Sequence, residues 1–151
     1  MYQTLLLLHN ALRWVFLLLA VYTILKALMG VINKTPFGPE DNKAAKFFIM
    51  VCHTQLLLGL ILYFTSPVIK SYMDLGMGVA MKDKLMRLQL VEHPLTMIIG
   101  VAIIQTGKIK VRKAYEDTVK HKRSLIFYSI GLILILSRIP WGNAPLLRGM
   151  E

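Results

Sequence analysis

The stretch "LLLLHNALRWVFLLL", residues 5–19, decides the fold, because it is apolar enough for lipid and still carries two ionisable side chains. His9 lies within this run, and Arg13 follows about one helical turn later. A charged side chain in the middle of a membrane helix costs about 2.5–3.5 kcal/mol even on lenient scales. A partner or ligand must therefore compensate for these groups, and its nature is the first question about function.

The composition of the chain also favours a membrane protein. The 151 residues are 56% hydrophobic, and the mean hydropathy is +0.57, whereas soluble domains contain about 45–50% apolar residues. The net charge of +10 lies in short stretches between apolar blocks. This distribution argues against nucleic acid as a partner, since a nucleic-acid-binding protein gathers Lys and Arg on one polar face. Cys52 is the single cysteine, which excludes a disulfide framework.

Four apolar blocks predict an all-α integral membrane protein, a four-helix bundle that forms one domain over residues 1–151. Each block approaches the ~20 residues that cross a hydrocarbon core about 30 Å thick. None of them has the polar outer face, repeating every 3.6 residues, of a helix in a soluble bundle. The predicted helices cover residues 5–29, 47–65, 85–106 and 124–140.

Lys and Arg in the loops predict the orientation of these helices. The third loop, "KIKVRKAYEDTVKHKRS" at residues 108–124, is strongly basic, so we expect it on the cytoplasmic side together with the first loop. The helices then run up-down-up-down, and both termini lie on the outer face. The expected location is the bacterial inner membrane, with the lipid bilayer as the main partner.

The four histidines of the chain fall on or beside different predicted helices: His9, His53, His93 and His121. In the expected orientation, the first and third helices carry their histidines in the outer half of the membrane. The second and fourth helices carry theirs in the inner half. First and third helices are diagonal partners in an up-down-up-down bundle, as are second and fourth.

This arrangement predicts haem ligation. Neighbouring axes 8–10 Å apart give a diagonal of roughly 12–14 Å, which is about the span of an imidazole–iron–imidazole unit. Neutral imidazole is also a preferred axial ligand of haem iron. His9 and His93 form one predicted pair of iron ligands. His53 and His121 form the other, so the expected cofactor is one or two b haems.

Other polar residues and one glycine have two interpretations each. Arg13 and Arg138 could bind the propionates of a haem through their guanidinium groups, or could reach lipid phosphates. Gly100, two turns from His93, could leave room for a macrocycle or allow close helix packing. Gln89 could support the ligand His93 or contact a substrate. Glu92 is expected to pair with an arginine, or to accept a proton from a quinol.

Several motifs resemble those of small four-helix cytochrome b-like membrane proteins: "LHNALRW", "HTQLLLGLILYF", "VEHPLTMIIG" and "KHKRSLIFYSIGLILILSRIPW". The arrangement of one histidine per helix is also similar to that of larger di-haem transmembrane cytochromes b, which carry electrons across a membrane. The resemblance implies an outer haem on His9 and His93. It implies an inner haem on His53 and His121.

The expected function is electron transfer through haem b, with a quinol as a candidate substrate, and a cytochrome fits better than a classical enzyme. The alternative is a non-catalytic subunit that stabilises a larger membrane complex or a homo-oligomer. In that case the histidines form hydrogen bonds between helices. An enzyme of haem or quinone metabolism is a third possibility.

Overall fold

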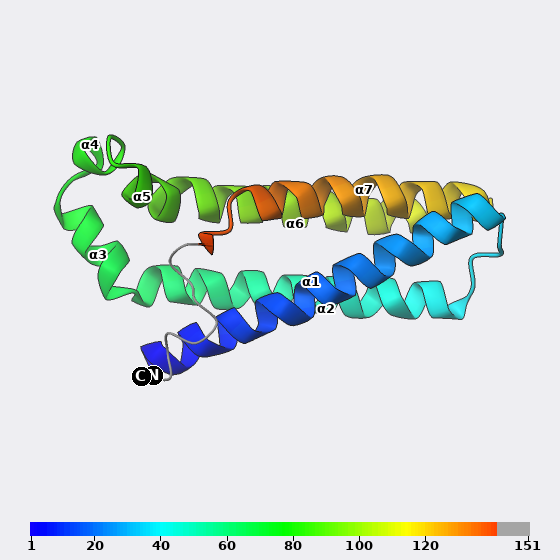
Figure 1. Ribbon diagram of the computed structural model, residues 1–151, viewed down its shortest axis with the longest axis horizontal. Helices are drawn as coiled ribbons and strands as arrows, with labels where there is room; N and C mark the ends of the chain where they lie inside the picture. Colours follow the sequence, from blue (N-terminus) through cyan, green and yellow to red (C-terminus); the bar gives the residue numbers. More distant parts are fainter. Residues whose placement is uncertain (142–151) are drawn as a thin grey trace.

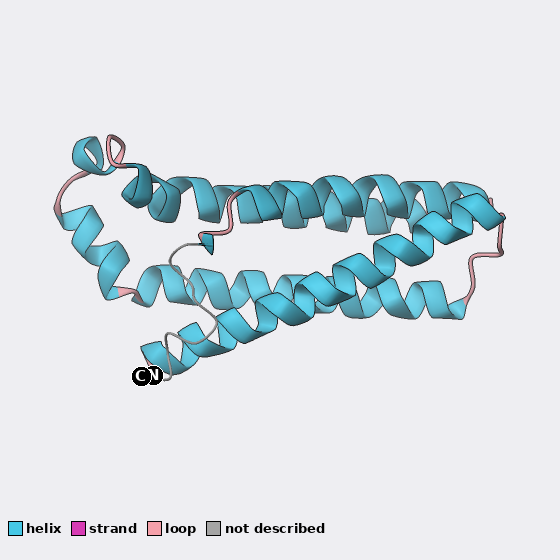
Figure 2. Ribbon diagram, viewed as in Figure 1, coloured by secondary structure: helices cyan, strands magenta, loops and turns pink. Residues whose placement is uncertain are grey.

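The structure, a computed structural model, describes residues 1–141, and all regular elements in that part of the chain are helical. Four long helices extend alongside one another, and three short ones form a cap at one end (Figures 1 and 2). The elements are α1 (Tyr2–Asn33), α2 (Pro39–Thr65), α3 (Pro67–Asp74), α4 (Met77–Ala80), α5 (Lys84–Arg87), the π-helical turn η1 (Leu88–Glu92), α6 (His93–Arg112) and α7 (Asp117–Ser137). The predicted all-α class is confirmed for the described residues.

The long helices pack in neighbouring pairs. α1 contacts α2 and α7, and α6 contacts the same two helices. Consecutive long helices run in opposite directions, so the α1–α2 and α6–α7 connections lie at one end and α3 to α5 at the other (Figure 1). The predicted position of the C-terminus on the outer face falls on residues 142–151, which lie outside the described residues.

Three helical segments are long and apolar enough to cross a membrane: α1, α2 and the continuous stretch Lys84–Arg112. This confirms three of the four predicted spans at the level of length and composition. α7 differs because its first two turns are rich in charge, and its uncharged part covers only residues 124–137. At 1.5 Å per residue that part extends about 21 Å, which is shorter than a ~30 Å hydrocarbon core. The fourth span therefore stays a prediction.

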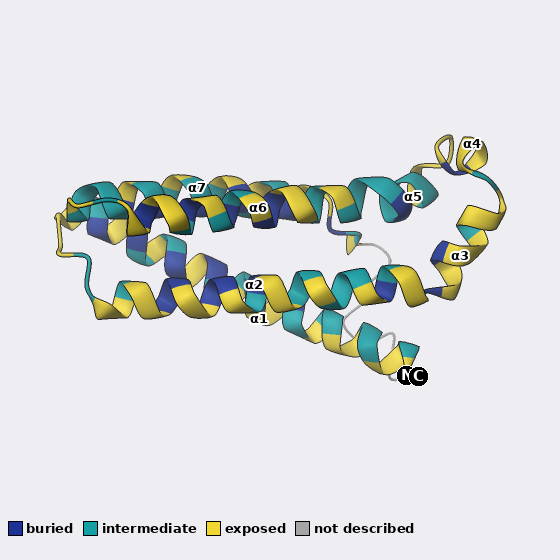
Figure 3. Cartoon of the chain, turned by 180° about the vertical axis from the view of Figure 1, so that it is seen from behind, coloured by how far each residue is buried: buried dark blue, intermediate teal, exposed yellow. Residues whose placement is uncertain are grey.

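The buried residues lie where the long helices face one another (Figure 3), and many of the exposed residues on the outer faces are large and apolar. The outward-facing residues include Leu18 of α1, Phe64 of α2, Leu95 of α6 and Ile133 of α7, each more than half exposed. A soluble protein rarely exposes large apolar side chains on all of its long helices, whereas a protein surrounded by lipid does so. The apolar outer faces are thus consistent with a multi-pass membrane protein.

Fully or almost fully buried aromatic side chains pack between the long helices. Phe48 contacts both Phe16 and Tyr128, with ring centroids 5.6 and 5.3 Å apart. α6 and α7 lie close together at two glycines, where a Cβ atom on Gly100 would lie 3.3 Å from the carbonyl oxygen of Gly131. Gly100 therefore allows close helix packing, the second of the two interpretations given above.

Candidate functional site

A cavity of about 370 Å³ lies between α1, α2, α6 and the end of α7, on the side of α3 to α5. Its size falls within the range of roughly 300–1,000 Å³ that is usual for ligand pockets. Most of its wall is apolar. Among the polar side chains that line it are His9, Arg13, Gln55, Gln89 and His93. An apolar cavity with a few convergent polar groups is the usual form of a cofactor or small-molecule site.

His9 enters the cavity from α1, and its surroundings leave part of the imidazole unpaired. Gln55 of α2 donates a hydrogen bond through Nε2 to the backbone oxygen of His9 at 2.9 Å, and the same Nε2 lies 3.4 Å from the ring Nε2. His9 Nδ1 is buried and has no hydrogen-bond partner among the described residues. A glycine lies beside the ring, since a Cβ atom on Gly59 would be 3.1 Å from His9 Cε1. His9 Nδ1 is thus a buried polar atom at the cavity without a partner among the described residues, a situation that native structures rarely show.

His93 stands directly after an irregular part of its helix. Pro94 has no N–H group, so the carbonyl four residues earlier, that of Leu90, lacks its usual helical donor. The hydroxyl of Tyr63, from α2, donates to this oxygen at 3.0 Å. The π-helical turn η1 ends when the N–H of His93 bonds the carbonyl of Leu88. Such turns are frequent at functional sites, and this one determines how His93 enters the cavity.

The ring of His93 has a defined tautomer. Its Nδ1 lies 2.8 Å from the backbone oxygen of Arg138, at the end of α7. A carbonyl can only accept a hydrogen bond, so Nδ1 carries the proton and Nε2 keeps its lone pair. Histidines that bind metals usually show this second interaction, which orients the ring and raises the basicity of the ligating nitrogen. Sequence reasoning missed this role of Arg138, because a backbone carbonyl leaves no signal in the residue type.

The cation of the cavity is Arg13, not Arg138. Arg13 is 7% exposed and lines the cavity, and its Cζ lies 5.6 Å from the ring centroid of Trp14 and 5.7 Å from that of Trp141. Arg138 instead pairs with Glu92, with its Nε 3.2 Å from Oε2. Arg87 binds the other carboxylate oxygen at 2.8 Å. The ion pair expected for Glu92 is therefore confirmed, and it engages the guanidinium of Arg138.

The structure does not bring His53 and His121 to this cavity. His53 is exposed on α2. His121 is 1% exposed at the opposite end of the molecule, where its Nε2 lies 3.2 Å from the backbone oxygen of Thr35. No described contact joins the two histidines. Gly100 also lies away from the cavity wall, at the α6–α7 contact. Of the predicted site residues, the structure brings together His9, His93, Arg13 and Gln89 at the cavity.

Three cavity residues beyond the predicted set tie the helices together. Gln55 connects α2 to α1, and Tyr2 lies with its hydroxyl 3.2 Å from that of Ser66. These pairs are far apart in sequence, so only the packing of α1 on α2 reveals them. Within residues 1–141, no group of three or more His, Cys, Asp or Glu side chains is arranged to hold a metal ion.

Comparison of the chain with protein-family models, with curated proteins and with solved structures gave no match. The function is therefore argued from the geometry of the cavity itself.

Proposed function

We propose that this chain is a multi-pass membrane protein that binds one haem b between His9 and His93 and transfers electrons. The observation that carries the proposal is the position of the two histidines: they come from α1 and α6 and line one cavity. His9 has a buried ring nitrogen without a partner among the described residues. His93 has its Nδ1 occupied by a carbonyl, which leaves Nε2 available as a ligand.

The other residues of the cavity fit the same group. Aliphatic walls formed by residues such as Leu56 and Val101 exclude water, and Gly59 leaves space beside the imidazole of His9. Arg13 provides a buried guanidinium, which binds a carboxylate such as a propionate through two parallel hydrogen bonds. Haem held by two imidazoles supplies a one-electron redox couple, whose potential depends on burial and hydrogen bonding. A quinol from the lipid phase is the proposed electron donor.

The proposal includes an arrangement in the bilayer. α7 serves as the fourth span, because it packs along α1 and α6 and has an apolar outer face. The helices then cross up-down-up-down with the N-terminus outside, and the basic end, with the α6–α7 connection, lies in the cytoplasm of a bacterium. The single-haem cavity lies in the outer half of the membrane.

Difference spectra of purified variants test the haem proposal. Wild-type protein made with adequate haem supply should give the reduced-minus-oxidised bands of a b-type cytochrome. His9→Ala and His93→Ala should each lose most of these bands, because each removes an axial ligand. His53→Ala is the matched control and should retain them, since His53 is exposed and outside the cavity. Absence of the bands from the wild type, or their retention in both ligand variants, would overturn the proposal.

A second candidate function is supported by the hydrogen bonds already present. The contact of Gln55 with His9 joins α1 and α2, and that of His93 with the Arg138 carbonyl joins α6 to the end of α7. Polar contacts of this kind stabilise membrane helices by about 0.6 kcal/mol on average. They suit a non-catalytic subunit within a larger membrane complex. For such a subunit, His93→Ala should lower stability modestly, and the purified protein should carry no pigment.

A further inference from the structure

The two ends of the molecule differ in charge. The basic end consists of residues 34–46 and 108–123, which include the α1–α2 and α6–α7 connections and contain ten Lys or Arg against four Asp or Glu. Residues 66–92, at the end of the molecule formed by α3 to η1, contain four Lys or Arg against three Asp or Glu. Only the basic end therefore carries a large excess of cations.

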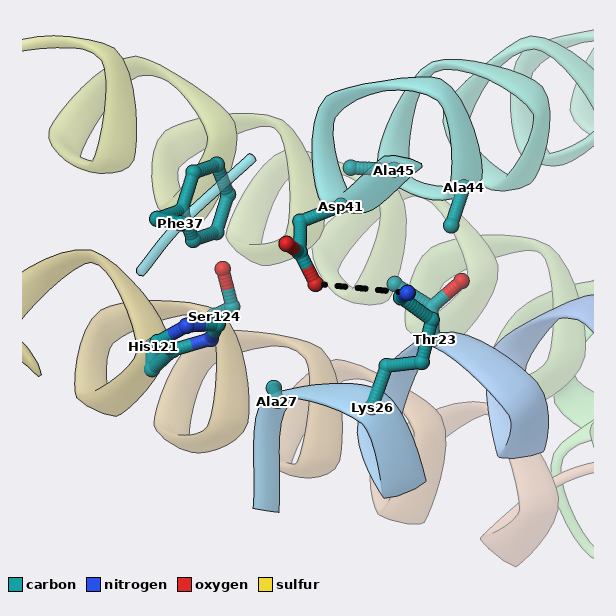
Figure 4. Close-up of a pocket in the computed structure, with 9 residues that line it drawn as sticks. All are labelled: Thr23, Lys26, Ala27, Phe37, Asp41, Ala44, Ala45, His121 and Ser124. Atoms are coloured by element: carbon teal, nitrogen blue, oxygen red, sulfur yellow. Dashed lines mark ion pairs between the residues drawn. The ribbon is translucent and has the colours of Figure 1, made fainter. Parts of the chain in front are cut away.

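Two acidic residues at the basic end already have a lysine as partner. The carboxylate of Asp41 lies 3.6 Å from the Nζ of Lys26, and Figure 4 shows this ion pair between α1 and α2. The carboxylate of Asp117 lies 2.9 Å from the Nζ of Lys120. These acids are thus not available to neutralise the remaining cations of the α6–α7 connection.

Lys110 of α6 and Arg123 of α7 lie next to each other where the two helices meet. Arg123 donates a hydrogen bond through one guanidinium nitrogen to the backbone oxygen of Lys110 at 2.6 Å. The Nζ of Lys110 lies 5.8 Å from the ring centroid of Phe127, also on α7. Within residues 1–141 neither cation forms an ion pair. A guanidinium has five N–H donors, so Arg123 is held in place and keeps donors for an anion.

An apolar strip continues from these two cations along the outer face of α7. Ile126 and Ile130 follow Arg123 by three and seven residues, so they share its side of the helix, and they are 53% and 45% exposed. At 1.5 Å per residue, Ile130 lies about 10 Å further along the helix axis than Arg123. The cations and the strip together match the two parts of an anionic phospholipid, a charged headgroup and an acyl chain.

We propose that one anionic phospholipid binds at this place, with its phosphate between Lys110 and Arg123 and an acyl chain along Ile126 and Ile130. A guanidinium forms two parallel hydrogen bonds with phosphate oxygens, and the ammonium group of a lysine adds a compact charge. Basic pockets between membrane helices are a usual place for anionic headgroups. The inference rests on the proposed bilayer arrangement, in which α7 spans the membrane, and it requires no haem.

Thermal midpoints in detergent test the lipid preference. Saturating phosphatidylglycerol should raise the midpoint of the wild type by about 2–4 °C more than phosphatidylcholine does. The double variant Lys110→Gln/Arg123→Gln should lose this difference. Lys82→Gln/Lys84→Gln removes two exposed cations from the other end, so it is the matched control and should keep the difference. Equal effects of the two lipids on the wild type, or an undiminished difference in the first double variant, would overturn the proposal.

Two measurements on the wild type keep the proposal testable if the first double variant does not fold. Inorganic phosphate should leave the midpoint unchanged, and a rise equal to that with phosphatidylglycerol would show that the cations bind a free anion in place of a lipid. A photoactivatable phosphatidylglycerol should label peptides from residues 108–130. Labelling confined to residues 66–92 would place the lipid at the other end and overturn the proposal.

These outcomes are distinct from those that test haem binding. Protein without pigment that still prefers phosphatidylglycerol would contradict the haem and leave the lipid site standing. Protein with the bands of a b-type cytochrome and no lipid preference would contradict the lipid site alone.

Discussion

The two ends of the molecule use the same pair of residue types, a histidine against a glycine of a neighbouring helix, with opposite results. At one end the ring of His121 lies so close to Gly30 that a Cβ atom there would overlap it. At the other end His9 lies beside Gly59, where a Cβ atom would lie 3.1 Å from His9 Cε1, a tight contact that a small shift of the ring would relieve. The difference follows from helix direction: α1 diverges from α6 and α7 toward its N-terminus (Figure 1). Histidine is thus a packing residue where the helices converge, and lines a cavity where they diverge.

The largest effect that this comparison predicts comes from the packed region between the ends. Phe48→Ala should lower the free energy of unfolding by about 3–5 kcal/mol, because it opens a cavity next to Phe16 and Tyr128. Phe47→Ala is the matched control. Phe47 is next to Phe48 in the sequence, but its side chain is 44% exposed, so the variant should have little effect. Unfolding in a denaturing detergent measures both. Equal losses of unfolding free energy for the two variants would mean that packing at Phe48 stabilises the protein no more than a side chain on the outer face.

Substitution of the two glycines compares the ends directly. Gly30→Ala should destabilise the protein by about 1–3 kcal/mol, because the new methyl group meets a fully buried imidazole. Gly59→Ala should cost less than about 1 kcal/mol, because the ring of His9 can move into the cavity. The same unfolding measurement provides the comparison. Equal costs, or a larger cost at Gly59, would contradict the distinction between the packed end at His121 and the cavity at His9.

A smaller effect is expected at the irregular turn before His93. Tyr63→Phe removes the hydroxyl that serves the Leu90 carbonyl, which Pro94 leaves without a helical donor. The expected loss of stability is about 1 kcal/mol, with a shift of the haem bands because the position of His93 changes. Tyr115→Phe, at a residue that is 97% exposed, should change neither quantity. An unchanged spectrum and midpoint for Tyr63→Phe would show that the hydrogen bond does not position His93.

The smallest effect concerns pH at the packed end, outside the apolar part of α7. A hydrogen bond from Lys120, together with one from the backbone N–H of Phe37, holds the pKa of Asp117 below its ordinary value. The carboxylate form is thus favoured by folding. Its stabilising contribution is complete above the unfolded pKa, about 4, and is lost as the pH falls through the lower folded value.

Asp117→Asn should therefore weaken the loss of stability with acid. Thermal midpoints of the wild type and the variant between about pH 7 and pH 3 should converge at the acid end. A constant difference between the two curves across this range would assign the effect of Asp117 to packing and not to its charge.

The sequence predicts the helical class and three membrane spans, because long apolar runs constrain both. It also predicts that His9 and His93 fall in the same half of the membrane, and the structure places both at one cavity. The depth of His121 could not be inferred in the same way. Its neighbours in sequence are cations, which suggest a solvated loop, yet Gly30 of α1 and the α1–α2 connection cover the imidazole. These contacts join residues far apart in the sequence, so they depend on how α1 packs against α7.

The direction in which each side chain points from its helix could not be predicted from the sequence either. His53 is flanked by Cys52, which is buried, and is itself exposed, because neighbours in a helix point about 100° apart. A helix that is apolar on all sides gives no periodic signal for the face that meets its neighbours. The hydrogen bonds that Gln55 and the Arg138 carbonyl make with the histidines also depend on packing, and no pattern of residue types predicts them.

The most direct test of the central claim is the ratio of haem to protein, measured as the pyridine haemochrome of the detergent-purified chain. The cavity between His9 and His93 predicts one haem per chain. A ratio of zero would contradict haem binding. A ratio of two would contradict the single site, because His53 is exposed and His121 is enclosed at the far end of the molecule.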